Sequence, residues 1–307
     1  MKLFRKREDP KVCEMVHFVY EHARLSRRNK RYKCTYRVLA KHLTQFEESR
    51  GIKLMSNSFN VQVAEDFIYY MNNKGLMLNT IRGYYDKVKY MLRRMSRMGF
   101  EVDFSFEHVI IKDEETNAIY ITSDEIRRIA ELKIRGRERD VVRDRFVCNC
   151  LTGFRYGDFS KLTAANIKGN VIFRKTEKKG AIVEVPIHPI VRKILDKYNG
   201  NFPYYEKSQQ NYNVIIKKIC KQVGITDKVL WERTVGGKVV RKTFKRYELV
   251  SSHTARRSFA TNAYLAGIPT ARIMLITGHK TEDSFFKYIR ISRSENAKLL
   301  ADHPFFN

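Results

Sequence analysis

The chain has 307 residues, and its 60 lysines and arginines against 33 acidic residues give a formal net charge of +27. So large a positive charge favours a polyanionic partner over a small metabolite. Nucleic acid is the first candidate, because binding releases its counterions, and an anionic membrane surface is the second. The hydrophobic share of 43% is ample for packed cores, which excludes a disordered basic tail. At this length we expect one large domain or two of medium size.

The N-terminus is basic but has no apolar run behind it, which argues against a secretory signal. No stretch approaches the ~18 apolar residues that a membrane-spanning helix needs. The five cysteines are odd in number and scattered, a pattern typical of reduced thiols in a cytoplasmic protein. Cys148-x-Cys150 lacks the spacing of a zinc knuckle, so we expect no bound metal there.

The first hundred residues have the apolar periodicity of helices, which predicts a bundle of about four helices. The segments with this periodicity are Val12–Leu25, Tyr36–Glu48, Val61–Asn72 and Ile81–Arg97. We assign residues 1–105 to this helical domain.

The last of these helices has an apolar stripe and a basic side. The stripe consists of Ile81, Tyr85, Val88, Leu92 and Met95, and the basic side carries Arg82, Lys89, Arg93 and Arg97. A solvated surface is the ordinary interpretation of such a side. Because the whole protein is basic and few acids accompany these cations, we predict that they contact DNA phosphates.

Residues 106–120 are predicted to link two domains. The preceding Val102–Phe106 alternates like an extended chain, and a short polar run follows at residues 112–117. A new helix is then expected at Thr122, because Thr122 and Glu125 have the spacing of a capping box.

The second part, residues 121–307, mixes helices with short strands. Val142, Phe146 and Cys150 predict a buried helix that ends near Gly153, and helical segments from His253 onward are expected to stop at Gly267 and Gly278. Two hairpins are predicted, one over 171–174 and 182–187, the other over 229–234 and 238–244 around Gly236-Gly237. The fold class is therefore mainly α with small antiparallel β-sheets.

The common catalytic signatures are missing from the sequence: it has no phosphate-binding loop, no H-E-x-x-H, no G-x-S-x-G and no dinucleotide fingerprint. What remains is an ordered set of basic groups followed by one tyrosine. The set comprises Thr152-Gly-Phe-Arg155-Tyr-Gly-Asp158, His253-Thr-Ala-Arg256, Gly278-His279, and Tyr288 nine residues later. Each of these groups alone has an ordinary structural interpretation, but their order and spacing together indicate a site.

This set resembles the signature of the tyrosine recombinases, or phage-type integrases: T-G-x-R-x-x-[ED], a lysine on a β-hairpin, H-x-x-R, G-H and a nucleophilic tyrosine. The wording around His253 is similar to integrases of Bacteroidetes mobile elements. The resemblance implies a helical core-binding domain and a catalytic domain that together enclose duplex DNA. It also implies a cytoplasmic, nucleoid-associated enzyme that needs no cofactor.

The resemblance also implies roles for individual residues. Arg155 and Arg256 would bind the scissile phosphate, which suits the paired donors of a guanidinium. Tyr288 would attack the phosphorus, with His253 as its base and His279 bonded to the phosphate or the tyrosine. Asp158 would support the site. The hairpin lysine would protonate the leaving oxygen: the spacing from Pro186 selects Lys178, while Lys175 and Lys179 are the competitors and otherwise contact DNA.

The segment after Tyr288 has apolar residues near its end, and two interpretations are open. It either packs on its own chain or, as the resemblance implies, docks on a neighbouring subunit of a tetramer; we favour docking in trans. Because the bundle begins by residue 12, we expect no separate arm-binding domain, which favours a DNA invertase or resolvase acting on short repeats. A minimal integrase is the alternative.

Two rival functions are weighed against this one. A type IB topoisomerase-like enzyme would share the chemistry without exchanging partners, and the tail argues against it. A DNA-binding regulator without chemistry would not be expected to keep every catalytic position filled.

Overall fold

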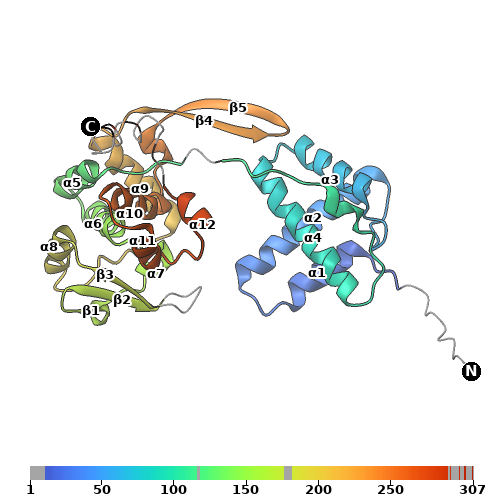
Figure 1. Ribbon diagram of the computed structural model, residues 1–307, viewed down its shortest axis with the longest axis horizontal. Helices are drawn as coiled ribbons and strands as arrows, with labels where there is room; N and C mark the ends of the chain where they lie inside the picture. The colour runs from blue at the N-terminus through green and yellow to red at the C-terminus, as the bar shows by residue number, and fades with distance from the viewer. Residues whose placement is uncertain are drawn as a thin grey trace, which may run out of the picture. The chain divides into compact units, whose positions relative to one another are not determined.

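The structure, a computed structural model, describes residues 11–115, 118–175 and 182–289, together with residues 291, 297, 301 and 306. Its contacts divide the chain into two compact units, drawn in Figure 1. Unit 1 consists of Met1–Thr116 and Trp231–Lys242, and unit 2 consists of Asn117–Leu230 and Thr243–Asn307.

Unit 1 is a bundle of four helices, at the positions that the periodicity predicts. They are α1 (Met15–Leu25), α2 (Lys30–Arg50), α3 (Val61–Asn73) and α4 (Leu78–Arg97). Asparagine side chains cap two of them, because Asn29 accepts from the Tyr32 amide and Asn60 from the Val63 amide. All five residues of the predicted apolar stripe on α4 are buried in the core of this unit.

The segment after α4 differs from the extended chain that we predict from its alternation. Residues Phe104–His108 form a short 3-10 helix, η1, and Phe106 is fully buried in the core of unit 1. The Tyr85 hydroxyl donates a hydrogen bond to the Phe106 carbonyl. Residues 104–108 therefore belong to the bundle, since burial of the Phe106 ring outweighs the local alternation.

Unit 2 contains the remaining helices, one whole sheet and the base of a second hairpin. Its longer helices are α5 (Ser123–Glu131), α6 (Arg137–Thr152), α8 (Pro189–Lys197), α9 (Gln209–Gln222), α10 (Ser252–Leu265) and α11 (Thr270–Thr277). Short helices are α7 (Tyr156–Phe159), α12 (Glu282–Phe286), η2 (Ala164–Asn166) and η3 (Arg246–Leu249). The capping box predicted at Thr122 and Glu125 is present at the start of α5, and helices end at Gly153 and Gly278 as predicted.

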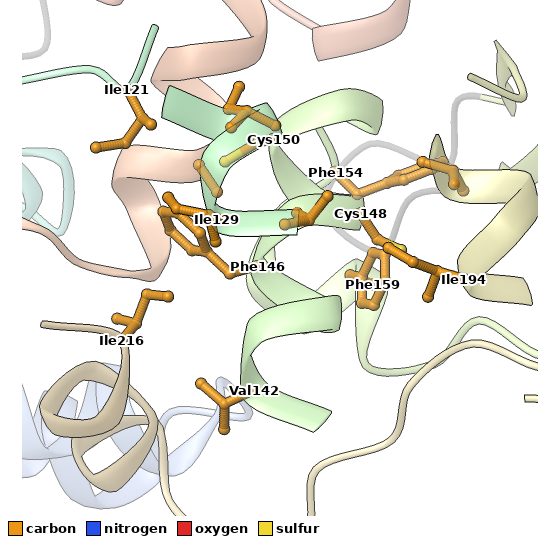
Figure 2. Packing of buried hydrophobic residues seen from close by; sticks show 14 of the residues in the cluster. Ile121, Ile129, Val142, Phe146, Cys148, Cys150, Phe154, Phe159, Ile194 and Ile216 are labelled. Atoms are coloured by element: carbon orange, nitrogen blue, oxygen red, sulfur yellow. The ribbon is translucent and has the colours of Figure 1, made fainter. Parts of the chain in front are cut away.

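Helix α6 lies at the centre of unit 2 and packs against α5, α8, α9 and α10. Figure 2 shows Phe146 pointing from α6 toward Ile129, while Cys148 lies on the side of Phe159 and Ile194. The helix is buried on all sides, so it also buries charged residues that an apolar stripe does not predict: Arg143, Asp144 and Arg145. Arg143 and Asp144 form an ion pair with each other. Arg145 instead contacts two aromatic rings and a hydroxyl group.

The two sheets are small and antiparallel, so the predicted fold class is confirmed. Strands β1 (Ile167–Lys168), β2 (Val171–Lys175) and β3 (Ile182–Pro186) form the first sheet, in which Lys175 is paired with Ile182 and Val171 with Pro186. Strands β4 (Lys228–Val235) and β5 (Lys238–Lys245) form the second predicted hairpin.

The tip of the second hairpin belongs to unit 1, which the sequence does not predict. The Gly236 amide donates to the Leu76 carbonyl, Val235 forms an isolated antiparallel bridge with Met77, and the Thr234 amide donates to the Glu114 carboxylate. The two units therefore differ from the predicted domains in two places. Residues 106–116, predicted to be part of a linker, belong to unit 1, and so does the tip of the second hairpin. Across the described part of the chain, the helices are all too short or too polar to cross a membrane.

Candidate active site

Arg155 is presented by a sharp break between two helices of unit 2. Helix α6 ends at Gly153, whose φ of +69° lies in the left-handed region that glycine adopts without strain. A side chain at this position would also collide with Phe259, because a Cβ would lie 2.4 Å from its ring. The chain then turns into α7, with Arg155 as its N-cap residue. Asp158, buried within α7, lies 3.8 Å from the Arg155 guanidinium.

Arg256 lies on α10 and is anchored by backbone carbonyls. Its guanidinium donates to the Gly153 carbonyl at 2.7 Å and to the Thr277 carbonyl. These two acceptors are the ends of α6 and α11, so one side chain ties three helices together at the site. Only 2% of Arg256 is exposed, so the guanidinium is held almost entirely out of water.

The electrostatic surroundings of Arg256 are dominated by burial and by a second arginine. Burial and the neighbouring charge of Arg155 lower the pKa of Arg256 to about 10, against the opposing effects of Tyr288 and Asp158. Because little water screens the buried Arg256, its positive charge and that of Arg155 repel each other. A bound dianion or phosphodiester would relieve that repulsion, so the pair is suited to hold phosphate.

Tyr288 follows α12 directly, and its backbone is held by the amide-to-carbonyl bond with Phe285 and by Thr261 of α10. Its half-buried ring packs against the small apolar cluster around Ile273 and Phe285. The Arg256 guanidinium carbon lies 5.8 Å from the centre of the Tyr288 ring.

Both predicted histidines lie against the same tyrosine. The ring centroid of His253 is 5.2 Å from that of Tyr288, and the centroid of His279 is 4.5 Å from it. The structure thus brings together four residues from three parts of the chain: His253 and Arg256 on α10, His279 after α11, and Tyr288 after α12. Arg155 joins them through its electrostatic effect on Arg256.

Thr277 is a site residue that the motifs do not include. Its buried hydroxyl donates to the Ile273 carbonyl and lies 2.8 Å from Nδ1 of His279. Because the hydroxyl has a single hydrogen, it accepts the bond from Nδ1–H, which fixes the tautomer and orientation of the His279 ring. The only signal in the sequence is its position directly before Gly278-His279.

The general acid predicted by spacing falls largely outside the described residues. Lys175 is exposed at the end of β2, where the hairpin opens toward the connection between β2 and β3. Lys178 and Lys179 lie in residues 176–181, which are not described.

The cations of α4 are in unit 1, and their surroundings correct one expectation. Arg82 forms ion pairs with Asp113 and Asp86, Arg93 with Glu107, and the Lys89 ammonium donates to the Val109 carbonyl. The expectation that few acids accompany this basic side is therefore wrong, because residues 107–113 fold back along α4. Arg97 is exposed, with no ion pair to any described residue.

This combination of a helical unit and a mixed α/β unit, with a tyrosine among arginines and histidines, is typical of enzymes that cut and rejoin DNA through a tyrosine. The chain belongs to the phage integrase family. The model of that family matches residues 120–295, and the model of the phage integrase SAM-like domain matches residues 14–101. It is thus a tyrosine recombinase, an enzyme class that carries out site-specific DNA recombination.

Three solved structures have a similar fold but are distant in sequence. The Tn1549 transposon integrase in complex with transposon right end DNA is 13% identical, with a TM-score of 0.69 over 94% of this chain and 98% of that chain. The XerH recombinase bound to palindromic difH is 13% identical, with a TM-score of 0.62 over 94% of each chain. A lambda integrase tetramer bound to a Holliday junction is 14% identical, with a TM-score of 0.61 over 87% of this chain and 76% of that one. No protein with a curated description matches the chain.

Proposed function

We propose that this recombinase cleaves DNA by attack of the Tyr288 hydroxyl on a backbone phosphate, which gives a 3′-phosphotyrosyl link and a free 5′-hydroxyl. The observation that carries the proposal is the convergence of the Tyr288 ring with Arg256 and with the rings of His253 and His279. The tyrosine oxygen forms a bond to phosphorus while the bond from phosphorus to the 5′-oxygen breaks.

Arg155 and Arg256 hold the non-bridging oxygens of that phosphate. In the free protein the two cations repel each other. A phosphate between them attracts both and outweighs this repulsion, and the negative charge that develops on the oxygens of the pentacoordinate phosphorus strengthens the attraction. Asp158 supports Arg155 from within α7. The two guanidinium groups thus bind the transition state better than the ground state.

Proton transfers complete the reaction. A phenol with a reference pKa of about 10 is a weak nucleophile at neutral pH, so His253 takes its proton as the attack proceeds. His279, oriented by Thr277, bonds the phosphate or the tyrosine oxygen. Lys178 protonates the departing 5′-oxygen, with Lys175 and Lys179 as the competitors for this role.

Rejoining reverses these steps. The 5′-hydroxyl of another strand attacks the phosphotyrosine and releases Tyr288, so the energy of the broken bond is kept and neither ATP nor a metal ion is required. The overall outcome is inversion, resolution or integration at short repeat sites.

The substrate is double-stranded DNA, and the assembly is a homo-tetramer on paired sites. A tetramer is what a lambda integrase forms on a Holliday junction. The segment after Tyr288 would dock in trans on the neighbouring subunit. Most of this segment lies outside the described residues.

Phosphate contacts along the DNA come from exposed cations. Arg97 and Lys175 are exposed and available for this role, whereas Arg82, Lys89 and Arg93 would first have to exchange their internal partners for phosphate. Lys179, which lies outside the described residues, is proposed for the same role.

Covalent trapping tests the mechanism. The protein and its Tyr288→Phe variant are incubated with labelled duplexes from the DNA around its own gene, each nicked so that the cut strand cannot be resealed. A protein-linked band on a denaturing gel that requires Tyr288 is the expected result. Equal bands with both proteins would assign the nucleophile elsewhere, and tight binding of every duplex without any band would favour a binding protein without this chemistry.

A further inference from the structure

Arg145 is the largest fully buried side chain among the described residues, and it lies on the central helix α6, ten residues before Arg155 in the sequence. Only 1% of the residue is exposed. Within the described part of the chain its guanidinium forms no ion pair with a carboxylate, and burial lowers its pKa. The groups that offset this effect are phenols and a thiol, foremost Tyr212 and Tyr156.

A buried cation without a carboxylate partner has a desolvation cost that opposes folding. Moving a charge out of water costs several kcal/mol, and replacing buried charges by well-packed apolar side chains is often neutral or stabilising. The ordinary interpretation, that Arg145 is there for stability, therefore fails on the energetics. The contacts of Arg145 indicate a different role.

Nearly all contacts of Arg145 are with the short helix α7. The guanidinium carbon lies 4.8 Å from the centre of the Tyr156 ring and 5.0 Å from that of the Phe159 ring. Nη2 donates to the Ser160 hydroxyl at 2.5 Å, and that hydroxyl donates to the Tyr156 carbonyl at 2.7 Å. Nη1 donates to the Pro203 carbonyl at 3.2 Å, which fixes the guanidinium from the far side.

Helix α7 has only four residues, Tyr156–Phe159, and its N-cap is Arg155. A helix of a single turn is not stable by itself, because nucleation costs more than one turn of hydrogen bonds returns. The rings of Tyr156 and Phe159, the Ser160 hydroxyl and the Tyr156 carbonyl all contact the planar guanidinium group of Arg145. The position of the Arg155 backbone is thereby tied to Arg145.

We infer that Arg145 is a positioning residue, which holds α7 so that Arg155 meets the scissile phosphate in the geometry that strand cleavage requires. The inference rests on the proposed function, in which Arg155 binds that phosphate. A displacement of about 1 Å at a reacting group is enough to reduce a rate about 100-fold.

The first test uses cleavage and stability together. Arg145→Met keeps a flexible, unbranched apolar side chain, shorter than that of arginine, and removes the donors and the charge. We expect it to unfold at the same temperature as the parent or higher, to bind DNA equally, and to form the Tyr288-linked product about 100-fold more slowly. Arg145→Lys and Ser160→Ala each keep part of the contacts, so we expect their cleavage rates to lie between those of the parent and Arg145→Met.

A chemical rescue separates positioning from general damage. The variants are assayed on the nicked duplex that gives the Tyr288-linked product, with either a normal phosphate or a neutral methylphosphonate at the cleavage position. The methylphosphonate removes the charge that Arg155 neutralises, so the defects of Arg155→Ala and Arg145→Met should both shrink to about 10-fold or less. If Arg155→Ala is rescued and Arg145→Met is not, the inference is overturned while the proposed function stands. If Arg155→Ala itself has no defect, the proposed function fails.

A measurement without DNA tests the positioning directly. In protein labelled with ¹⁵N-arginine, the Arg155 side-chain Nε–H signal is identified by its loss in Arg155→Lys. Arg145→Met should shift this signal and raise its mobility on the nanosecond timescale, while the Arg256 signal keeps its rigidity. An unchanged Arg155 signal in Arg145→Met and Arg145→Lys would contradict the inference, whatever the DNA substrate.

Discussion

At the scale of single residues, the orientation of His279 depends on one hydroxyl. Thr277→Val keeps the shape of the buried side chain but removes the acceptor of the Nδ1–H bond. We expect unfolding to become easier by about 1 kcal/mol and the Tyr288-linked product to form about 10-fold more slowly, because the imidazole loses its fixed tautomer. Thr277→Ser, which retains the hydroxyl, should behave like the parent. Equal cleavage rates for the Val and Ser variants would refute the role of this bond.

Gly153 is the second residue on which the site geometry depends. Gly153→Ala forces a side chain into a left-handed conformation and against the Phe259 ring, so we expect a loss of about 2–4 kcal/mol in urea unfolding. Cleavage should fall as well, since the Gly153 carbonyl anchors Arg256. In a Phe259→Ala background the same change should cost only about 1 kcal/mol, the strain of the backbone alone. A full loss there would show that the ring is not the obstacle.

At the scale of elements, helix α4 contains arginines of two kinds. Arg93 is paired with Glu107, whereas Arg97 is exposed near the C-terminus of the helix. We expect Arg97→Ala to reduce the slope of log affinity for DNA against log salt by about 0.9, the contribution of one phosphate contact, and Arg93→Ala to change it less. Titrations from 50 to 200 mM salt, followed by fluorescence anisotropy, measure both slopes. A larger change in slope for Arg93→Ala than for Arg97→Ala would mean that Arg93 exchanges Glu107 for a DNA phosphate.

The same helix shows where prediction from the sequence ends. Its apolar stripe and its end at Arg97 follow from periodicity, although it begins at Leu78, three residues before the predicted start. The ends of α6 and α11 follow from glycine at Gly153 and Gly278. The partners of Arg82 and Arg93 do not, because they come from residues that fold back only once Phe106 is buried. Local patterns specify local structure, whereas ion pairing depends on tertiary contacts that the patterns do not contain.

The residues of the site likewise divide into those that the sequence predicts and those that it does not. The order and spacing of Arg155, His253, Arg256, His279 and Tyr288 select them as a set, because they match the signature of the tyrosine recombinases. It does not reveal Thr277 or Arg145, whose roles come from a single hydroxyl and from contacts across helices. Both residues act through a neighbour, and a side chain that acts through another has no fixed spacing from the motif residue it supports.

At the scale of the whole molecule, two partly buried histidines couple stability to pH. Burial lowers the pKa of His22 and His42 below the usual 6.5, and nearby cations add to the effect. The unfolded chain therefore binds protons more readily than the folded one near this pH. Stability is fully present above about pH 7 and falls as the pH drops toward 5, before the carboxylates with lowered pKa begin to titrate.

Urea unfolding between pH 5 and 8 measures this dependence, and His42 is the residue to exchange. Its ring packs against Tyr84 at a centroid distance of 5.1 Å, and glutamine fills similar space without titrating. His42→Gln should flatten the fall in stability between pH 7 and 5, with the exposed His17→Gln exchange as the control. A slope unchanged by His42→Gln, or flattened equally by His17→Gln, would mean that burial of this imidazole does not set the response. Because His42 lies in unit 1, the flattening should appear in the unfolding of that unit.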